Sequence, residues 1–67
     1  MVYVQSKNNN GTEATIYAVL YSDATDLADD GILDSDEGEI KCHIGSWAYQ
    51  AGAKNLKQYD GTEWVDA

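Results

Sequence analysis

The fold class depends most on Ala14–Tyr21, which reads Ala-Thr-Ile-Tyr-Ala-Val-Leu-Tyr. Two secondary structures compete for it. Ile16, Val19 and Leu20 have the i, i+3, i+4 spacing of one face of a helix. The β-branched and aromatic side chains of the stretch are Thr15, Ile16, Tyr17, Val19 and Tyr21. Because such side chains favour extended backbone, we predict a strand here and a mainly β protein.

The residues before this stretch predict its partner strand. Val2–Lys7 alternates as a strand should, and Asn10-Gly11 is typical of a type I′ hairpin turn, which needs a positive φ at both central residues. With a two-residue turn at that position, Val4 lies opposite Tyr17. One face of this hairpin then carries Val2, Val4, Tyr17, Val19 and Tyr21. The other face is apolar as well, so we expect both faces to need cover.

The residues after Tyr21 predict a short helical turn and further strands. Ser22 or Asp23 can cap a single helical turn near residues 23–29. Asp60-Gly61 is a second hairpin signal. The predicted strands are Glu39–Ile44, Ser46–Gln50, Asn55–Tyr59 and Glu63–Val65. Short strands separated by frequent turns describe a single small antiparallel meander or barrel-like domain over residues 1–67.

The composition of the 67 residues limits the possible functions. Four basic residues stand against twelve acidic ones, which gives a net charge of −8. We therefore exclude nucleic acid and anionic membranes as partners, because binding to either needs basic side chains. The sequence shows no signal peptide and no apolar run of the ~20 residues that span a membrane, so we expect synthesis in a cytoplasm.

Many of the acidic residues fall in the segment 23–39, which we interpret as a solvated acidic loop. The alternative is a calcium site. Four carboxylates match positions of an EF-hand loop, namely Asp26, Asp30, Asp34 and Glu37. Gly31 takes the position of the sharp turn, but Ala28 stands where a further oxygen ligand belongs. We therefore do not favour a metal site.

Catalytic groupings are absent from the sequence. Cys42 and His43 are adjacent, so on a strand their side chains point to opposite faces and cannot form a thiolate–imidazole pair. We expect Cys42 to be a small buried side chain and His43 to face outward. No residue is assigned a catalytic role, no cofactor is expected, and the chain is predicted not to be an enzyme.

The last third of the chain carries a recognisable arrangement. Gly45-Ser46-Trp47-Ala48-Tyr49 is followed by a spacer through Lys57-Gln58-Tyr59 and by Asp60-Gly61-Thr62-Glu63-Trp64-Val65. It resembles short structural proteins of tailed bacteriophages and prophages, in particular head-fibre or decoration-type modules with Gly-Ser-x-Ala-Tyr and a final Asp-Gly-x-x-Trp hairpin. The resemblance implies a virion component that contacts a capsid or tail protein of the same phage.

Two further functions remain open beside this one. The first is a phage-encoded acidic regulator or inhibitor that binds a host protein, with acidic side chains mimicking the charge of nucleic acid. The second is a calcium-stabilised β module. As a virion component or as a phage-encoded regulator, the protein is expected to be made in the host cytoplasm. If it is a virion component, it is expected in the virion.

The supply of large side chains predicts where a partner binds. Five tyrosines, two tryptophans and many branched residues exceed what one side of one small sheet can bury. We expect the excess to contact a protein or a second copy, through Tyr3, Tyr17, Tyr21, Trp47 and Tyr49. The strand Val2–Lys7 is expected at a sheet edge, with Tyr3 as its anchor. Trp47 and Trp64 are both expected to be substantially buried.

Overall fold

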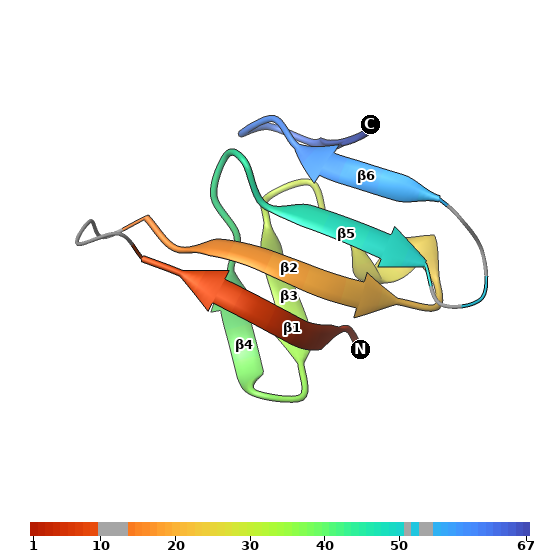
Figure 1. The fold of residues 1–67 in the computed structure, drawn as a ribbon, viewed down its shortest axis with the longest axis horizontal. Helices are drawn as coiled ribbons and strands as arrows, with labels where there is room; N and C mark the ends of the chain where they lie inside the picture. The colour runs from red at the N-terminus through yellow and green to blue at the C-terminus, as the bar shows by residue number, and fades with distance from the viewer. Residues whose placement is uncertain (10–13, 51, 53–54) are drawn as a thin grey trace.

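The computed structural model describes residues 1–9, 14–50, 52 and 55–67 and contains two β-sheets (Figure 1). The strands of the five-stranded sheet, in spatial order, are β1 (Tyr3–Asn8), β2 (Ile16–Tyr21), β5 (Trp47–Gln50), β6 (Leu56–Tyr59) and β7 (Trp64–Asp66). The second sheet is a hairpin of β3 (Ile32–Ser35) and β4 (Gly38–Lys41). A single 3-10 turn, η1 (Ala24–Asp26), lies between β2 and β3.

The mainly β class and the short helical turn predicted from the sequence are confirmed. The predicted antiparallel pairing is corrected at one place, because β2 and β5 run parallel with Val19 beside Ala48. Between these strands, residues 22–46 cross over one face of the sheet through η1 and the β3–β4 hairpin. This long connection returns the chain to the end of the sheet where β2 began, as a parallel pair requires.

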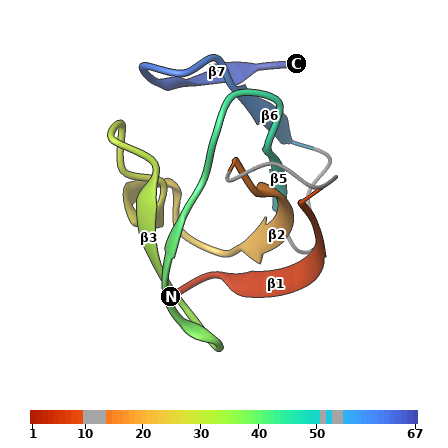
Figure 2. The ribbon, with the colours of Figure 1, turned by 90° about the vertical axis from the view of Figure 1, so that its left-hand side faces the viewer.

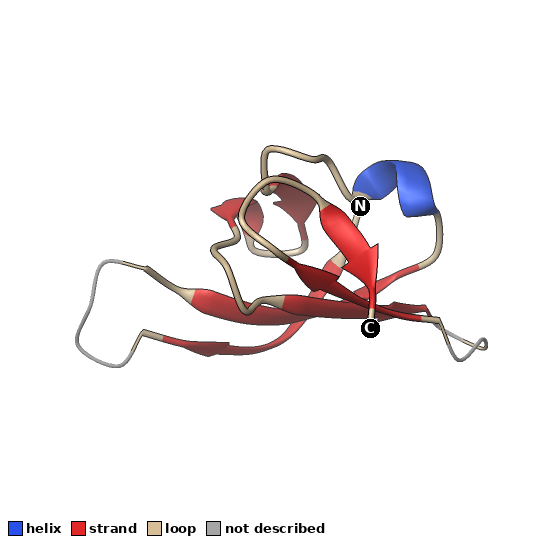
Figure 3. Cartoon of the chain, turned by 90° about the horizontal axis from the view of Figure 1, so that it is seen from above, coloured by secondary structure: helices blue, strands red, loops and turns tan. Residues whose placement is uncertain are grey.

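The crossover covers one face of the five-stranded sheet, which we call the inner face. In Figures 2 and 3, the hairpin and η1 lie on the same side of the sheet. The core lies between these layers and consists of Val2, Val19, Tyr21, Leu27, Leu33, Ile40, Cys42, Ala48, Tyr59 and Trp64. The opposite face, which we call the outer face, is covered by none of the described residues.

The first hairpin has a different register from the predicted one. Val4 pairs with Val19 instead of Tyr17, and a bulge interrupts the ladder between Val4 and Ser6. The predicted turn at Asn10-Gly11 lies outside the described residues. The predicted grouping of Val2, Val4, Tyr17, Val19 and Tyr21 on one face nevertheless agrees with the structure, because a shift of two residues keeps each side chain on the same face. The expectation that both faces need cover is met on this face only.

The acidic segment 23–39 is not one solvated loop, because it contains the predicted helical turn η1 and also the strand β3. The sequence patterns did not predict β3. Leu33 and Ser35 of β3 are buried, whereas Ile32 and Asp34 are exposed. This is the alternation of a strand with one face on a core. The surrounding run of acidic residues concealed so short a pattern.

The C-terminal hairpin forms as predicted, with Tyr59 of β6 opposite Trp64 of β7. Asp60 closes its turn by accepting hydrogen bonds from the backbone N–H groups of Thr62 and Glu63, both at 2.8 Å. These bonds hold the pKa of the Asp60 carboxyl below its usual range. Gly61 follows with φ of 103°, a conformation that glycine adopts without steric cost.

Candidate binding surface

The outer face is defined by residues that stand side by side on neighbouring strands. Tyr3 pairs with Leu20, Leu20 pairs with Tyr49, and Tyr49 pairs with Leu56. Because paired residues of a sheet project to the same side, these four form one row across β1, β2, β5 and β6. The described residues of the outer face are Tyr3, Ser6, Asn8, Ile16, Ala18, Leu20, Trp47, Tyr49, Leu56, Gln58 and Val65.

This face carries no charged side chain among the described residues of its strands, although 16 of the 67 residues of the chain are charged. The charged residues of the five strands project to the inner side. Lys7 reaches Glu37 in the turn of the β3–β4 hairpin, with Nζ and Oε1 3.5 Å apart. Lys57 pairs with Asp66, with Nζ and Oδ1 2.9 Å apart.

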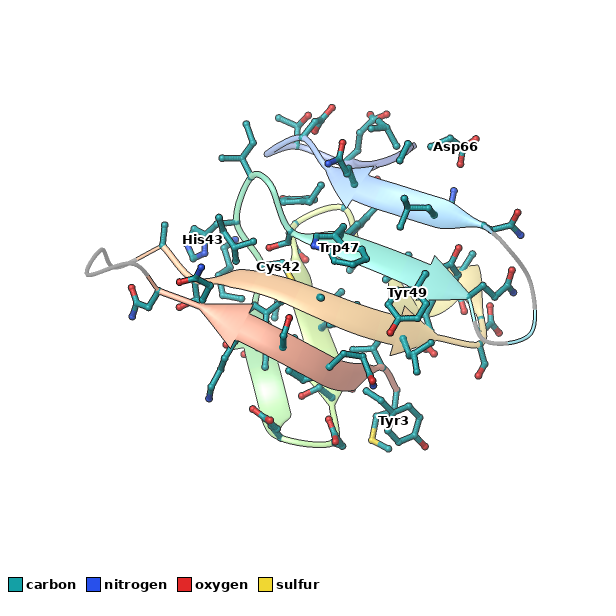
Figure 4. The ribbon with its side chains drawn as sticks, viewed as in Figure 1. Tyr3, Cys42, His43, Trp47, Tyr49 and Asp66 are labelled. Atoms are coloured by element: carbon teal, nitrogen blue, oxygen red, sulfur yellow. The ribbon has the colours of Figure 1, made fainter. Side chains whose placement is uncertain are left out.

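Aromatic and aliphatic side chains of the outer face are exposed. Tyr3 is 47%, Trp47 41% and Leu56 42% exposed. The rings of Trp47 and Tyr49 contact each other, with centroids 5.8 Å apart and planes inclined at 31°. Figure 4 shows both side chains in front of β5, on the side of the sheet opposite the hairpin. Together these residues form an apolar surface with an aromatic centre.

The polar atoms of the aromatic residues differ between the core and the outer face. In the core, Tyr59 Oη donates to Asp29 O at 2.8 Å and Trp64 Nε1 donates to Ala28 O at 3.1 Å. Trp47 Nε1 and Tyr49 Oη form no hydrogen bond with any residue that the structure describes. These groups can therefore bond to a partner without breaking a bond within the chain.

The structure brings together three of the five residues predicted to bind a partner, Tyr3, Trp47 and Tyr49, on the outer face. Tyr21 is 2% exposed and belongs to the core, and Tyr17 packs against the core. The prediction that Tyr17 and Tyr21 bind a partner is wrong, because both alternate with Leu20 along β2 and so point inward.

The predicted burial of both tryptophans is right for Trp64 and wrong for Trp47. The core lies on the inner face alone, so a side chain on the outer face stays exposed however large it is. Sequence reasoning also missed Leu56 and Val65 as members of the surface. Their place depends on the register of β5, β6 and β7, which no local pattern reveals.

The strand β1 lies at the edge of the sheet, as expected for Val2–Lys7. Part of this edge is already occupied. Val2 N donates to Asp34 O at 2.9 Å, and Asp36 N donates to Val2 O at 3.1 Å. Val4 N donates to Asp36 Oδ1 at 3.0 Å. Since these bonds and the bulge interrupt the row of free backbone groups, the outer face is a better candidate surface than the edge.

Three of the four carboxylates of the calcium hypothesis contact different partners, and the fourth is exposed. Asp26 lies 2.8 Å from the N-terminal ammonium, and Asp30 Oδ1 accepts from Ile32 N at 3.0 Å. Glu37 contacts Lys7, and Asp34 stands on the exposed side of β3. Within the described part of the chain, no group of three metal-ligating side chains is brought together.

Cys42 and His43 lie after the end of β4, in the turn that leads to β5. Cys42 is fully buried, as expected, and burial raises the pKa of its thiol to about 11. His43 is half-buried instead of facing outward, with Nδ1 3.3 Å from Thr15 O. A thiol that holds its proton so firmly is a poor nucleophile.

Comparisons of the chain with protein-family models, with curated proteins and with solved structures gave no match. Of the described helical segments, none has the length and apolar character that would let it span a membrane.

Proposed function

We propose that this protein is a small structural component of a phage virion that acts by protein–protein contact, and that the outer face is its contact surface. The observation that carries the proposal is the absence of charge from the described outer face of a strongly acidic chain. A solvated face gains from charged side chains, whereas a contact surface loses free energy when such groups are buried.

The shape and chemistry of the outer face suit a protein partner. The described residues enclose no pocket, so the surface fits a flat partner better than a small molecule. Tryptophan and tyrosine supply large contact areas at a small entropic cost, and they dominate the binding energy of many interfaces. Trp47, Tyr49 and Tyr3 are the anchors in this proposal.

The phage setting is supported by the Gly45–Tyr49 and Asp60–Trp64 segments, which resemble those of head-fibre or decoration-type modules. These segments have distinct roles in the fold. The first contributes Trp47 and Tyr49 to the outer face, and the second closes the C-terminal hairpin over the core. The partner in this proposal is a capsid or tail protein of the same phage.

The test is incorporation into particles. Phage lacking this gene would be grown in cells that supply the wild-type chain, Trp47→Ala or the control Ile32→Ala, and purified virions would be analysed by quantitative mass spectrometry. Ile32 is as exposed as Trp47 but lies on β3, on the other side of the molecule. We expect many copies of the wild-type and Ile32→Ala chains and few of Trp47→Ala. Absence of the wild-type chain from virions would overturn the proposal.

A second candidate function is the acidic regulator that binds a host protein. The observation in its favour is that Asp34 and Glu39 stand directly opposite each other across the β3–β4 hairpin, both exposed. Like charges in this position destabilise a hairpin, and a basic partner would relieve the repulsion. Capture of one host protein by the wild-type chain, lost in Asp34→Asn/Glu39→Gln and kept in Trp47→Ala, would favour this function.

A further inference from the structure

We propose that the outer face binds a second copy of this chain, forming a face-to-face dimer whose twofold axis runs parallel to the strands between β2 and β5. This inference rests on the outer face being a contact surface, as in the proposed function. It concerns the occupant of this face in the free protein, for which a capsid or tail protein would compete, and it adds the register in which the two copies meet.

The first argument is the order of side chains across the sheet. The row Tyr3, Leu20, Tyr49, Leu56 alternates aromatic and aliphatic residues over β1, β2, β5 and β6. A twofold axis between β2 and β5 places the same row of the second copy above it in reverse order. Every tyrosine then faces a leucine: Tyr3 meets Leu56 of the second copy, and Leu20 meets its Tyr49. Large and small side chains interdigitate, as they do between packed sheets.

The next row along the strands obeys the same rule. It consists of Ser6, Ala18, Trp47 and Gln58, which are paired across the same four strands. Reversal by the twofold axis places Ala18 opposite Trp47 of the second copy, so that the largest side chain of the face meets the smallest. Ser6 meets Gln58, so that polar groups meet at the margin. Both rows are therefore self-complementary about one axis.

The charge distribution permits this contact. The described outer face is uncharged, so the centre of the dimer buries no charge. The acidic hairpins lie on the inner side of each copy and point away from each other. The shortest extent of one molecule is 17 Å, which exceeds the Debye length of about 8 Å at physiological salt. Repulsion between two chains of net charge −8 is therefore largely screened.

The area of the outer face sets the expected strength of dimerisation. In this register the second copy overlaps β1, β2, β5 and β6, which have four to six residues each. Spaced about 4.8 Å apart with a rise of about 3.3 Å per residue, these four strands cover roughly 300 Å² in plan. The side chains make the accessible area larger, so two faces together bury on the order of 1,000 Å². This is near the lower limit for a specific interface, and a reversible dimer with a dissociation constant on the order of 10 μM is expected.

The first experiment measures mass by sedimentation equilibrium of the full chain from roughly 5 to 500 μM, a range that brackets the expected dissociation constant. We expect a rise from 7.3 kDa towards twice that value. Trp47→Glu should weaken the dimer at least about 100-fold, because it buries an unpaired charge. The control Ile32→Glu adds the same charge at a side chain with the same 41% exposure and should leave the dimer unchanged.

The second experiment tests the register. Ser6 and Gln58 are both exposed and are separated by β2 and β5 within one chain, so they cannot contact each other there. In Ser6→Lys/Gln58→Glu the introduced charges attract across the interface at two symmetric places, and dimerisation should strengthen about two- to tenfold. Ser6→Glu/Gln58→Glu places like charges there and should weaken dimerisation to a similar extent. Both effects should shrink at high salt.

If the wild-type chain is monomeric over the whole concentration range, the dimer proposal is wrong. It is also wrong if Ile32→Glu abolishes the dimer and Trp47→Glu does not. Equal dissociation constants for the two charge-pair variants at low salt would overturn the register. These results are separable from the proposed function. A monomer whose virion incorporation still requires Trp47 would leave the contact surface in place with another occupant, whereas a dimer absent from virions would remove the phage role alone.

Discussion

Tyr59 and Trp64 stand opposite each other on β6 and β7, with ring centroids 5.1 Å apart, and they donate hydrogen bonds to consecutive backbone carbonyls, those of Asp29 and Ala28. The C-terminal hairpin is thereby joined to the segment between η1 and β3. Since that segment belongs to the crossover, one aromatic pair connects the last two strands to the layer that covers the inner face.

Truncation of Trp64 should therefore destabilise the whole domain. Trp64→Ala removes a buried ring and its hydrogen bond to Ala28 O, and we expect the free energy of unfolding to fall by about 3–5 kcal/mol. Trp64→Phe keeps a ring and should lose about half as much. Urea denaturation followed by far-UV circular dichroism measures both. An alanine variant that unfolds at the wild-type urea concentration would show that the hairpin does not support the core.

Substitution of Gly31 should be more harmful than that of Gly38, although both have a positive φ. A Cβ at Gly31 would lie 2.7 Å from the carbonyl oxygen of Cys42, whereas a Cβ at Gly38 meets nothing within 4 Å. Gly38→Ala should lower the free energy of unfolding by about 1 kcal/mol, because alanine at a positive φ is strained. Gly31→Ala should lower the free energy of unfolding by about 1–3 kcal/mol more than Gly38→Ala does, because the backbone at Cys42 must move to admit the new Cβ. Equal melting temperatures for the two variants would contradict this.

The stability of the protein should fall as the pH rises from about 9 to about 11. Burial raises the pKa of the Cys42 thiol to about 11 from its usual 9.0, so the unfolded chain loses this proton at a lower pH than the folded chain. The pKa of Tyr59 is also raised, mainly by burial, and acts in the same direction. Urea denaturation at stepped pH should give a shallower decline in Cys42→Ala, with the remainder due to Tyr59. Identical pH profiles would refute the assignment to Cys42.

Calcium should have little effect on thermal stability. Asp26 and Asp30 are held by different partners, the N-terminal ammonium and Ile32 N, and Glu37 contacts Lys7. Bringing their carboxylates together would break these contacts. We expect the melting temperatures in excess calcium and in EDTA to agree. A rise of many degrees with calcium would mean that the segment 23–39 rearranges around the ion.

Local patterns were enough to place most strands. The β-branched and aromatic residues of Ala14–Tyr21 form β2, and the Asp60-Gly61 signal marks the C-terminal hairpin. The same patterns failed at Ile32–Ser35, where two apolar residues among acids are too few to show a period. They also failed for Trp47, whose size suggested burial although its face of the sheet is exposed.

The amino-acid sequence alone shows that the chain is acidic, mainly β and rich in aromatic side chains beyond the needs of a small core. It also determined which residues share a face along each strand, because that alternation is local. Which of the two faces is buried cannot be read from any single strand. That choice depends on the side over which residues 22–46 cross and on the parallel pairing of β2 with β5. Both are contacts between distant segments, and they leave Tyr3, Trp47 and Tyr49 on the uncovered face.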